Sequence, residues 1–124
     1  MIQFMKGNTK YGEIEAIKNT ENFEVKQFGT PDLIASPRDI DFEEGKKALE
    51  FAKKIIKDDE YDIVILDEIG VAVQYEIINV EDVLELIENK PEQMELIITG
   101  GPKMHPLIKA KADLVTEMRM IKHY

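Results

Sequence analysis

The hydrophobic and polar residues of this chain follow two different periods. Ile40 to Ile56 carries apolar residues at helical spacing with lysines and glutamates between them, which predicts an amphipathic helix. The next segment, Tyr61 to Leu66, is a nearly continuous aliphatic run of the kind found in strands that are buried on both faces of a sheet. A helix followed by such a strand indicates an α/β domain with a parallel sheet.

The remaining segments continue this alternation. The other predicted elements are strands at Met1 to Met5, Phe23 to Phe28 and Leu96 to Ile98, helices at Tyr11 to Lys18, Val80 to Ile87 and Leu107 to Ala110, and a last strand that begins at Leu114 and Val115. Asn79 occupies an N-cap position, and Pro91 marks the end of the helix that Asn79 begins. Gly29 to Pro37 is rich in turn residues and is predicted to be a loop, either a lid or a plain connection. Short connections between these elements predict a parallel sheet flanked by helices.

Length and composition limit the function classes. The 124 residues predict a single domain, residues 1–124, with one core. The formal net charge of -9 argues against nucleic acid and anionic membranes as partners, so an anionic ligand needs a local basic pocket. The chain has no cysteine, which excludes disulfides and thiolate metal sites. No apolar run approaches the roughly 20 residues of a membrane span, and no signal peptide is visible. We therefore expect a soluble, cytoplasmic protein.

Two adjacent carboxylates carry the clearest chemical signal. The aliphatic residues Ile63 to Leu66 are followed directly by Asp67 and Glu68. A buried strand that ends in acids places them at the carboxyl edge of the sheet, where ligands of α/β proteins usually bind. Asp67 can bind a water ligand of Mg²⁺ there, and Glu68 can position a reacting group. Acids at such positions form the Walker B pattern of nucleotide-binding proteins. The alternative is an acidic strand end that caps the following helix.

The phosphate-binding loop that accompanies the Walker B acids in P-loop proteins is absent from the sequence. No stretch matches G-x-x-x-x-G-K-[ST], the loop whose amides and lysine hold phosphates. Thr99 to Pro102 contains glycines but is too short, and Pro102 lacks an amide donor, so a strand-to-helix turn is the favoured interpretation. His105 and His123 have no metal-ligand spacing, which favours surface or hydrogen-bonded histidines over ligands.

Longer strings of sequence resemble a known family. Ile2 to Gly7 followed by Tyr11-Gly12-Glu13 is similar to the VQFxKG…GE strand of the ATP:corrinoid adenosyltransferases. Later segments follow in the family's order: YDIVILDEI at 61–69, INVEDVLELI at 78–87, IITG at 97–100 and ADLVTEMRMIKHY at 112–124. The last string is the most specific, because no general structural reason makes it recur. The resemblance covers almost the whole chain.

The resemblance implies a RecA-like P-loop fold, usually dimeric, in which ATP and Mg²⁺ lie at the strand ends. The cobalt of a reduced corrinoid such as cob(I)alamin attacks the 5′-carbon of ATP, so the protein mainly positions the partners and neutralises the departing triphosphate. Asp67 and Glu68 are then the catalytic acids, and Asp67 holds the Mg²⁺. The other positions that the resemblance implies for cofactor binding are Lys6, Tyr11, Glu13, Thr99, Arg119, Lys122 and His123.

The chain departs from the family pattern at its start. Family members have a strand, a glycine-lysine loop and a helix before the VQFxKG strand, whereas this sequence begins at that strand and lacks the first strand, the P-loop and the first helix. Because that first strand is central in P-loop folds, we expect the strands to close up into a rearranged sheet or a second subunit to cover the gap.

Two functions stay open at this point. The first is an adenosyltransferase whose phosphate loop comes from another chain or from sequence upstream of a wrongly assigned start. The second is a non-catalytic family relic that acts as a corrinoid-binding or protein-interaction module. A triphosphate that no phosphate-binding loop holds binds weakly near so acidic a surface. This favours the second function for the isolated chain.

Overall fold

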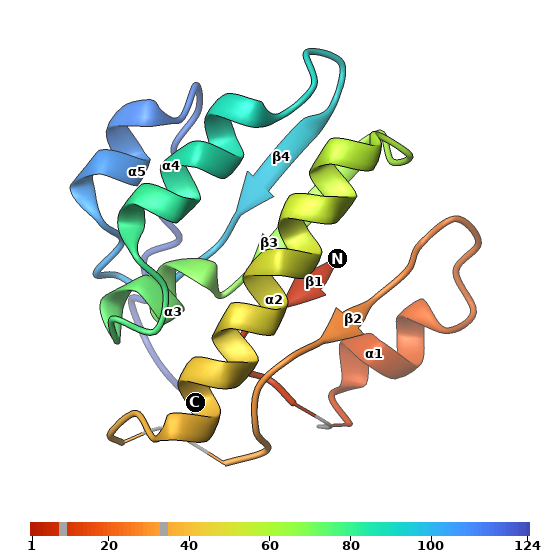
Figure 1. Cartoon of the computed structure of the whole chain (residues 1–124). Coiled ribbons are helices and arrows are strands. Elements are labelled where there is room, and N and C mark those ends of the chain that lie inside the picture. Colours follow the sequence, from red (N-terminus) through yellow and green to blue (C-terminus); the bar gives the residue numbers. More distant parts are fainter. Residues whose placement is uncertain (8–9, 33–34) are drawn as a thin grey trace.

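One parallel sheet organises the chain (Figure 1). A computed structural model describes residues 1–7, 10–32 and 35–124. The strands are β1 (Ile2–Gln3), β2 (Lys26–Gln27), β3 (Ile63–Asp67) and β4 (Glu95–Ile98). Their order is β2-β1-β3-β4, and each neighbouring pair is parallel. This confirms the predicted α/β class with a parallel sheet and is consistent with a RecA-like fold. The four strands are contiguous, so the described sheet has no gap at its centre.

Helices connect and cover the strands. They are α1 (Gly12–Ile17), α2 (Asp39–Asp58), α3 (Ile69–Gln74), α4 (Val80–Asn89) and α5 (Pro106–Lys111). In Figure 1, α2 runs across the sheet, α4 lies beside α2, and α5 lies against α4. Four of these helices coincide with the predicted ones. The sequence pattern missed α3, because six residues that follow directly on an apolar strand are too few to show a helical period.

The core lies between α2 and the sheet. The apolar stripe of α2 is buried, including Ala48, Ala52 and Ile56. Val64 and Leu66 of β3 belong to the same cluster of buried residues, and Leu66 is fully buried. Burial of a leucine of this kind stabilises the fold by roughly 1.5–3 kcal/mol. The long amphipathic helix therefore holds β3, and with it the residues that follow β3, in a fixed position.

The prediction that β3 is buried on both faces is wrong. Val64 and Leu66 are buried, but Ile63 is 54% exposed and Ile97 of β4 is 45% exposed. The burial of β3 thus alternates along the strand, as expected when helices cover one face more completely than the other. An aliphatic run alone does not reveal this difference, because isoleucine is compatible with either face.

Two strand predictions are corrected. Leu114 and Val115 form no strand, and residues 112–124 contain no helix or strand. Both side chains are exposed, Leu114 by 84% and Val115 by 54%, because no neighbouring strand pairs with this segment among the described residues. In the predicted strand from Phe23 to Phe28, only Lys26 and Gln27 pair with β1. The described residues between Gly29 and Pro37 form a loop, as predicted, while positions 33–34 lie outside the described residues.

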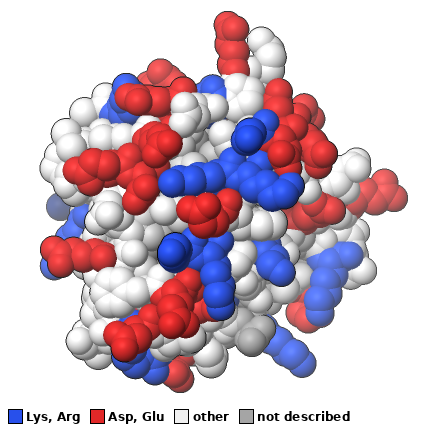
Figure 2. All heavy atoms as spheres, viewed as in Figure 1, with Lys and Arg blue, Asp and Glu red and all other residues white. Residues whose placement is uncertain are grey.

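The surface mixes both charges. Figure 2 shows acidic and basic side chains interspersed over the face that carries α2, without a broad basic area on that face. None of the helices in the described part of the chain is long and apolar enough to cross a membrane.

Candidate functional site

Side chains from three strand ends meet at Asp67. In the parallel sheet, Gln3 of β1 is opposite Asp67 of β3, and Leu66 is opposite Ile98 of β4. The residues beyond these positions therefore converge: Lys6 Nζ lies 3.0 Å from Asp67 Oδ2, and Thr99 Oγ1 donates a hydrogen bond of 2.9 Å to Asp67 Oδ1. Both carboxylate oxygens of Asp67 are thus engaged, one by a cation and one by a hydroxyl.

Glu68 stands in an unusual backbone conformation beside Asp67. Its φ of 62° lies in the left-handed region, which is strained for a residue with a side chain. The backbone N–H of Glu68 donates to Thr99 Oγ1 at 2.8 Å, and its carboxylate lies 3.4 Å from Lys6 Nζ. Glu68 occupies the N-cap position of α3, but its side chain makes no capping hydrogen bond. The alternative interpretation, in which the acids serve as a helix cap, therefore does not hold for Glu68.

Lys6 is held between the two acids and an aromatic ring. Partial burial by itself lowers the pKa of Lys6, but the hydrogen bond and charge of Asp67, together with the charge of Glu68, outweigh it and raise the pKa above its ordinary value. The ring of Tyr11 lies 5.4 Å from Nζ, within the range of a cation–π contact. Lys6 is consequently a fixed positive charge at the strand ends of an acidic chain.

Gln3 is a site residue that the sequence prediction missed. Its side chain is 1% exposed, and its Nε2 donates to Asp67 Oδ2 at 3.1 Å. Its Oε1 accepts a hydrogen bond from Gln27 Nε2 at 2.9 Å. The available signal was a single polar residue between the buried apolar residues Ile2 and Phe4.

Glycines allow the backbone segments around the site to approach closely. Gly29 has a φ of 116°, and a Cβ atom there would lie 2.9 Å from the backbone nitrogen of Lys6. A Cβ atom on Gly100 would lie 2.9 Å from the Cα atom of Gly70. The Thr99 carbonyl accepts from the Gly70 N–H at 3.1 Å, which joins the end of β4 to the start of α3. The segment from Thr99 to Pro102 is thus a strand-to-helix connection, as the sequence predicted.

Comparison with known proteins assigns the family. The family model described as "ATP:corrinoid adenosyltransferase BtuR/CobO/CobP" matches residues 1–124. The chain belongs to this family. It is 36% identical over 129 residues to a corrinoid adenosyltransferase of Sinorhizobium sp, covering 99% of this chain and 59% of the relative. It is 32% identical over 125 residues to the corrinoid adenosyltransferase of Escherichia coli K12, covering 99% of this chain and 62% of the relative. The chain therefore spans less than two thirds of the length of these curated relatives.

The structure brings together only some of the adenosyltransferase positions that the resemblance implies. Lys6, Tyr11 and Thr99 surround Asp67 and Glu68. Glu13 lies in the first turn of α1 and is exposed.

Three further positions lie in the segment after α5, where all side chains are exposed: Arg119, Lys122 and His123. The ring of His123 stacks on Tyr124 with the ring centroids 4.6 Å apart. No described contact joins this segment to Asp67. His105 is a hydrogen-bonded histidine, as expected, because its Nδ1 accepts from the Leu107 N–H at 3.2 Å at the start of α5.

The donor set at Asp67 suits Mg²⁺ better than a softer metal. In the described residues no group of three or more His, Cys, Asp or Glu side chains is placed to hold a metal ion. Mg²⁺ does not need such a cage, since it commonly uses one or two carboxylates, keeps several waters and binds substrate phosphates. The carboxylate of Asp67 and the adjacent hydroxyl of Thr99 are oxygen donors of this type. The residues present therefore fit Mg²⁺ bound through Asp67.

Proposed function

We propose that this chain carries the metal-side half of an ATP:corrinoid adenosyltransferase site, with ATP and a reduced corrinoid as substrates. The observation that supports this most directly is the convergence of Lys6, Asp67 and Thr99 from three different strand ends. A carboxylate beside a lysine and a hydroxyl at the carboxyl edge of a parallel sheet is suited to a metal-bound polyphosphate. Membership of the adenosyltransferase family supports the same assignment.

In the proposed reaction these residues orient the substrates and compensate charge. The electron pair of the reduced cobalt forms a bond to the 5′-carbon of ATP, the C5′–O bond breaks, and the triphosphate leaves with the electron pair of the broken C5′–O bond. Asp67 would hold the Mg²⁺, which would supply positive charge to neutralise the leaving triphosphate. Lys6 adds a second positive charge, and Thr99 and Glu68 keep Asp67 and Lys6 in place. The chain thus contributes orientation and charge compensation rather than proton transfer.

The remaining family-implied positions have a proposed role in binding the substrates. Tyr11 and Glu13 both follow Lys6 along the chain, and the Tyr11 ring contacts the Lys6 ammonium group. Arg119, Lys122 and His123 bring cationic groups to the exposed C-terminal segment of a chain whose formal net charge is -9. We propose that this segment folds over the bound triphosphate, because its cationic groups can form charge-assisted hydrogen bonds with the phosphates.

We also propose that the chain works as a homodimer in the cytoplasm. Large apolar side chains in the C-terminal segment are extensively exposed, including Met118 by 95% and Ile121 by 85%. Exposed apolar surface of this kind supports association with another polypeptide. Sedimentation equilibrium of the purified chain tests the dimer directly, and a monomer at all concentrations contradicts it.

A non-catalytic module is the alternative function. It is favoured by the formal net charge of -9, which weakens the binding of an anionic triphosphate to the chain. Calorimetric titration with MgATP, with and without a reduced corrinoid, and an assay of adenosyl transfer separate the two functions. Transfer that is abolished in Asp67→Asn supports the enzyme. Corrinoid binding without transfer supports the corrinoid-binding module. A chain that binds neither substrate contradicts the enzyme and the corrinoid-binding module, and leaves the protein-interaction module.

A further inference from the structure

Gln3, Gln27 and Asp67 form one row across the sheet. In the register of the parallel strands, Gln3 of β1 is opposite Gln27 of β2 on one side and opposite Asp67 of β3 on the other. Opposite residues in a sheet project to the same face, so these three side chains lie in line. The row ends at the carboxylate that we assign to the metal.

The direction of the hydrogen bonds in this row is determined by chemistry. An ionised carboxylate only accepts, so Gln3 must present its NH₂ group to Asp67, at 3.1 Å. The Gln3 oxygen then faces the other way and accepts from the NH₂ group of Gln27, at 2.9 Å. If Gln3 turned over, it would place oxygen against oxygen at Asp67 and NH₂ against NH₂ at Gln27. Asp67 therefore fixes the orientation of the Gln3 amide, and Gln27 supplies the donor that the Gln3 oxygen needs in that orientation.

Burial makes this arrangement costly to leave unsatisfied. Gln3 is 1% exposed, and one of its neighbours in sequence, Phe4, is also 1% exposed. A buried side-chain amide that lacks its hydrogen bonds destabilises the fold by roughly 1–3 kcal/mol. The hydrogen bonds of Gln3 to Asp67 and Gln27 are therefore costly to break. A residue that served only to fill this space would be apolar, as Ile2 and Phe4 are.

The hydrogen bonds of this row also determine which carboxylate oxygen of Asp67 is available to bind a cation. Oδ2 accepts from both Gln3 and Lys6, at 3.1 and 3.0 Å, whereas Oδ1 accepts from Thr99 at 2.9 Å. Each carboxylate oxygen has about two acceptor directions. Among the described contacts, Oδ2 is fully used and Oδ1 retains one direction. The carboxylate is thus turned so that Oδ1 is the oxygen with room for a cation.

We propose that Gln3 is a positioning residue that orients Asp67 for its metal, and that Gln27 acts through Gln3. This inference rests on the proposed function for the role of the metal, but not for the orientation of Asp67. Partners that hydrogen-bond a metal-binding carboxylate commonly contribute about 10–100-fold to metal affinity.

The metal arm of the test uses Mn²⁺ as the probe, with free Mn²⁺ measured by electron paramagnetic resonance, with and without ATP. Gln3→Met keeps the length of the side chain and removes the amide, and we expect Mn²⁺ affinity to fall about 10-fold. Gln27→Met should produce a smaller loss in the same direction. The exposed Gln93 provides the matched control, and Gln93→Met should leave the affinity unchanged. If Asp67→Asn abolishes binding but Gln3→Met binds like the wild type, the positioning role is wrong while the proposed function stands.

The orientation arm needs no metal. Three-bond couplings to the carboxyl carbon of Asp67 report whether its χ1 angle is fixed or averaged. We expect one χ1 rotamer in the wild type and in Gln93→Met, and averaging in Gln3→Met. A fixed χ1 in Gln3→Met overturns the inference whatever the metal does. If wild-type protein binds no Mn²⁺, the proposed function fails, and the couplings still decide whether Gln3 orients Asp67.

Discussion

The hydroxyl of Thr99 ties the end of β4 to the end of β3 by donating to Asp67 Oδ1 at 2.9 Å. The same oxygen accepts from the backbone N–H of Glu68 at 2.8 Å, so the hydroxyl donates to one residue and accepts from the next. A single small side chain therefore holds both acids of the proposed site.

Thr99→Val should disrupt this link at nearly constant volume. The substitution leaves the Glu68 N–H and one oxygen of Asp67 without this partner, which should lower the free energy of unfolding by about 1–3 kcal/mol. Urea denaturation measures the loss. Thr99→Ser keeps the hydroxyl and is the matched control, and equal destabilisation by both substitutions contradicts the assigned role of the hydroxyl.

Glu68→Gly should separate stability from function. Glycine relieves the left-handed backbone strain at φ 62°, which should raise the free energy of unfolding by about 1–2 kcal/mol. The greater freedom of glycine in the unfolded chain should lower it by about 0.5–1 kcal/mol. The carboxylate of Glu68 is 37% exposed, so loss of its contact with Lys6 changes stability little. We expect thermal stability to be unchanged or slightly increased and the proposed adenosyl transfer to fall. Glu68→Gln, which keeps the strain and removes the charge, shows which property the reaction needs.

Gly29→Ala should destabilise the chain. The new Cβ atom would lie 2.9 Å from backbone atoms of both Met5 and Lys6, at a φ of 116° that alanine rarely adopts. We expect a loss of more than about 2 kcal/mol, together with weaker ligand binding because Lys6 is displaced. Gly12→Ala is the control, since a Cβ atom there meets nothing within 4 Å. Comparable losses in the two variants, measured by urea denaturation, argue against the close approach.

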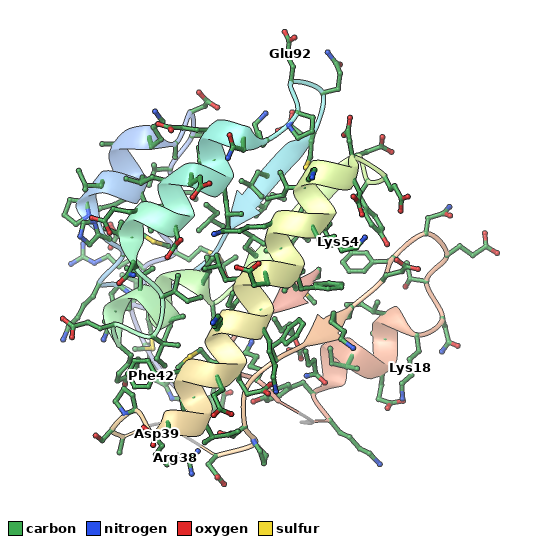
Figure 3. All side chains as sticks on the ribbon, viewed as in Figure 1. Lys18, Arg38, Asp39, Phe42, Lys54 and Glu92 are labelled. Carbon is green, nitrogen blue, oxygen red and sulfur yellow. The ribbon has the colours of Figure 1, made fainter. Side chains whose placement is uncertain are left out.

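Asp41→Asn should make stability depend less on pH. Asp41 is 3% exposed at the start of α2, where Arg38 lies in Figure 3, and it accepts from the Arg38 backbone N–H at 2.8 Å and from Arg38 Nε at 3.1 Å. The side-chain hydrogen bond from Arg38 lowers the pKa of Asp41 below its ordinary value of 3.8, against the opposing effect of burial. A lowered folded-state pKa contributes stability above the unfolded value, and this contribution is lost as the pH falls through the folded value.

At pH 7 the Asp41→Asn variant should therefore be less stable than the wild type by about 1–2 kcal/mol. The difference should shrink as the pH is lowered below about 4, because the Asp41 carboxyl is then protonated in the unfolded wild-type chain while it is still ionised in the folded one. Denaturation curves at pH 7, 5 and 3 measure this change. A difference that stays constant over this range shows that the charge of Asp41 does not contribute.

Local patterns in the sequence were sufficient for the elements whose side chains repeat over several turns. The helical spacing between Ile40 and Ile56 predicted α2, and the aliphatic run before Asp67 predicted β3. Leu114 and Val115 show the limit of such patterns. Two apolar residues satisfy the composition of a strand, but a strand also needs a neighbour to pair its backbone groups, and none lies beside this segment in the described chain.

The sequence by itself determined the α/β class, the family and the presence of two acids at the end of a buried strand, because these depend on periodicity and on strings of adjacent residues. Only the tertiary structure decided which side chains surround those acids. Lys6, Gln3 and Thr99 are 31 or more positions away from their partners at Asp67 and Glu68, and the strand order brings them together. The physical reason is that hydrogen bonds and ion pairs depend on distances of about 3 Å in space, which strand register sets and local sequence does not encode.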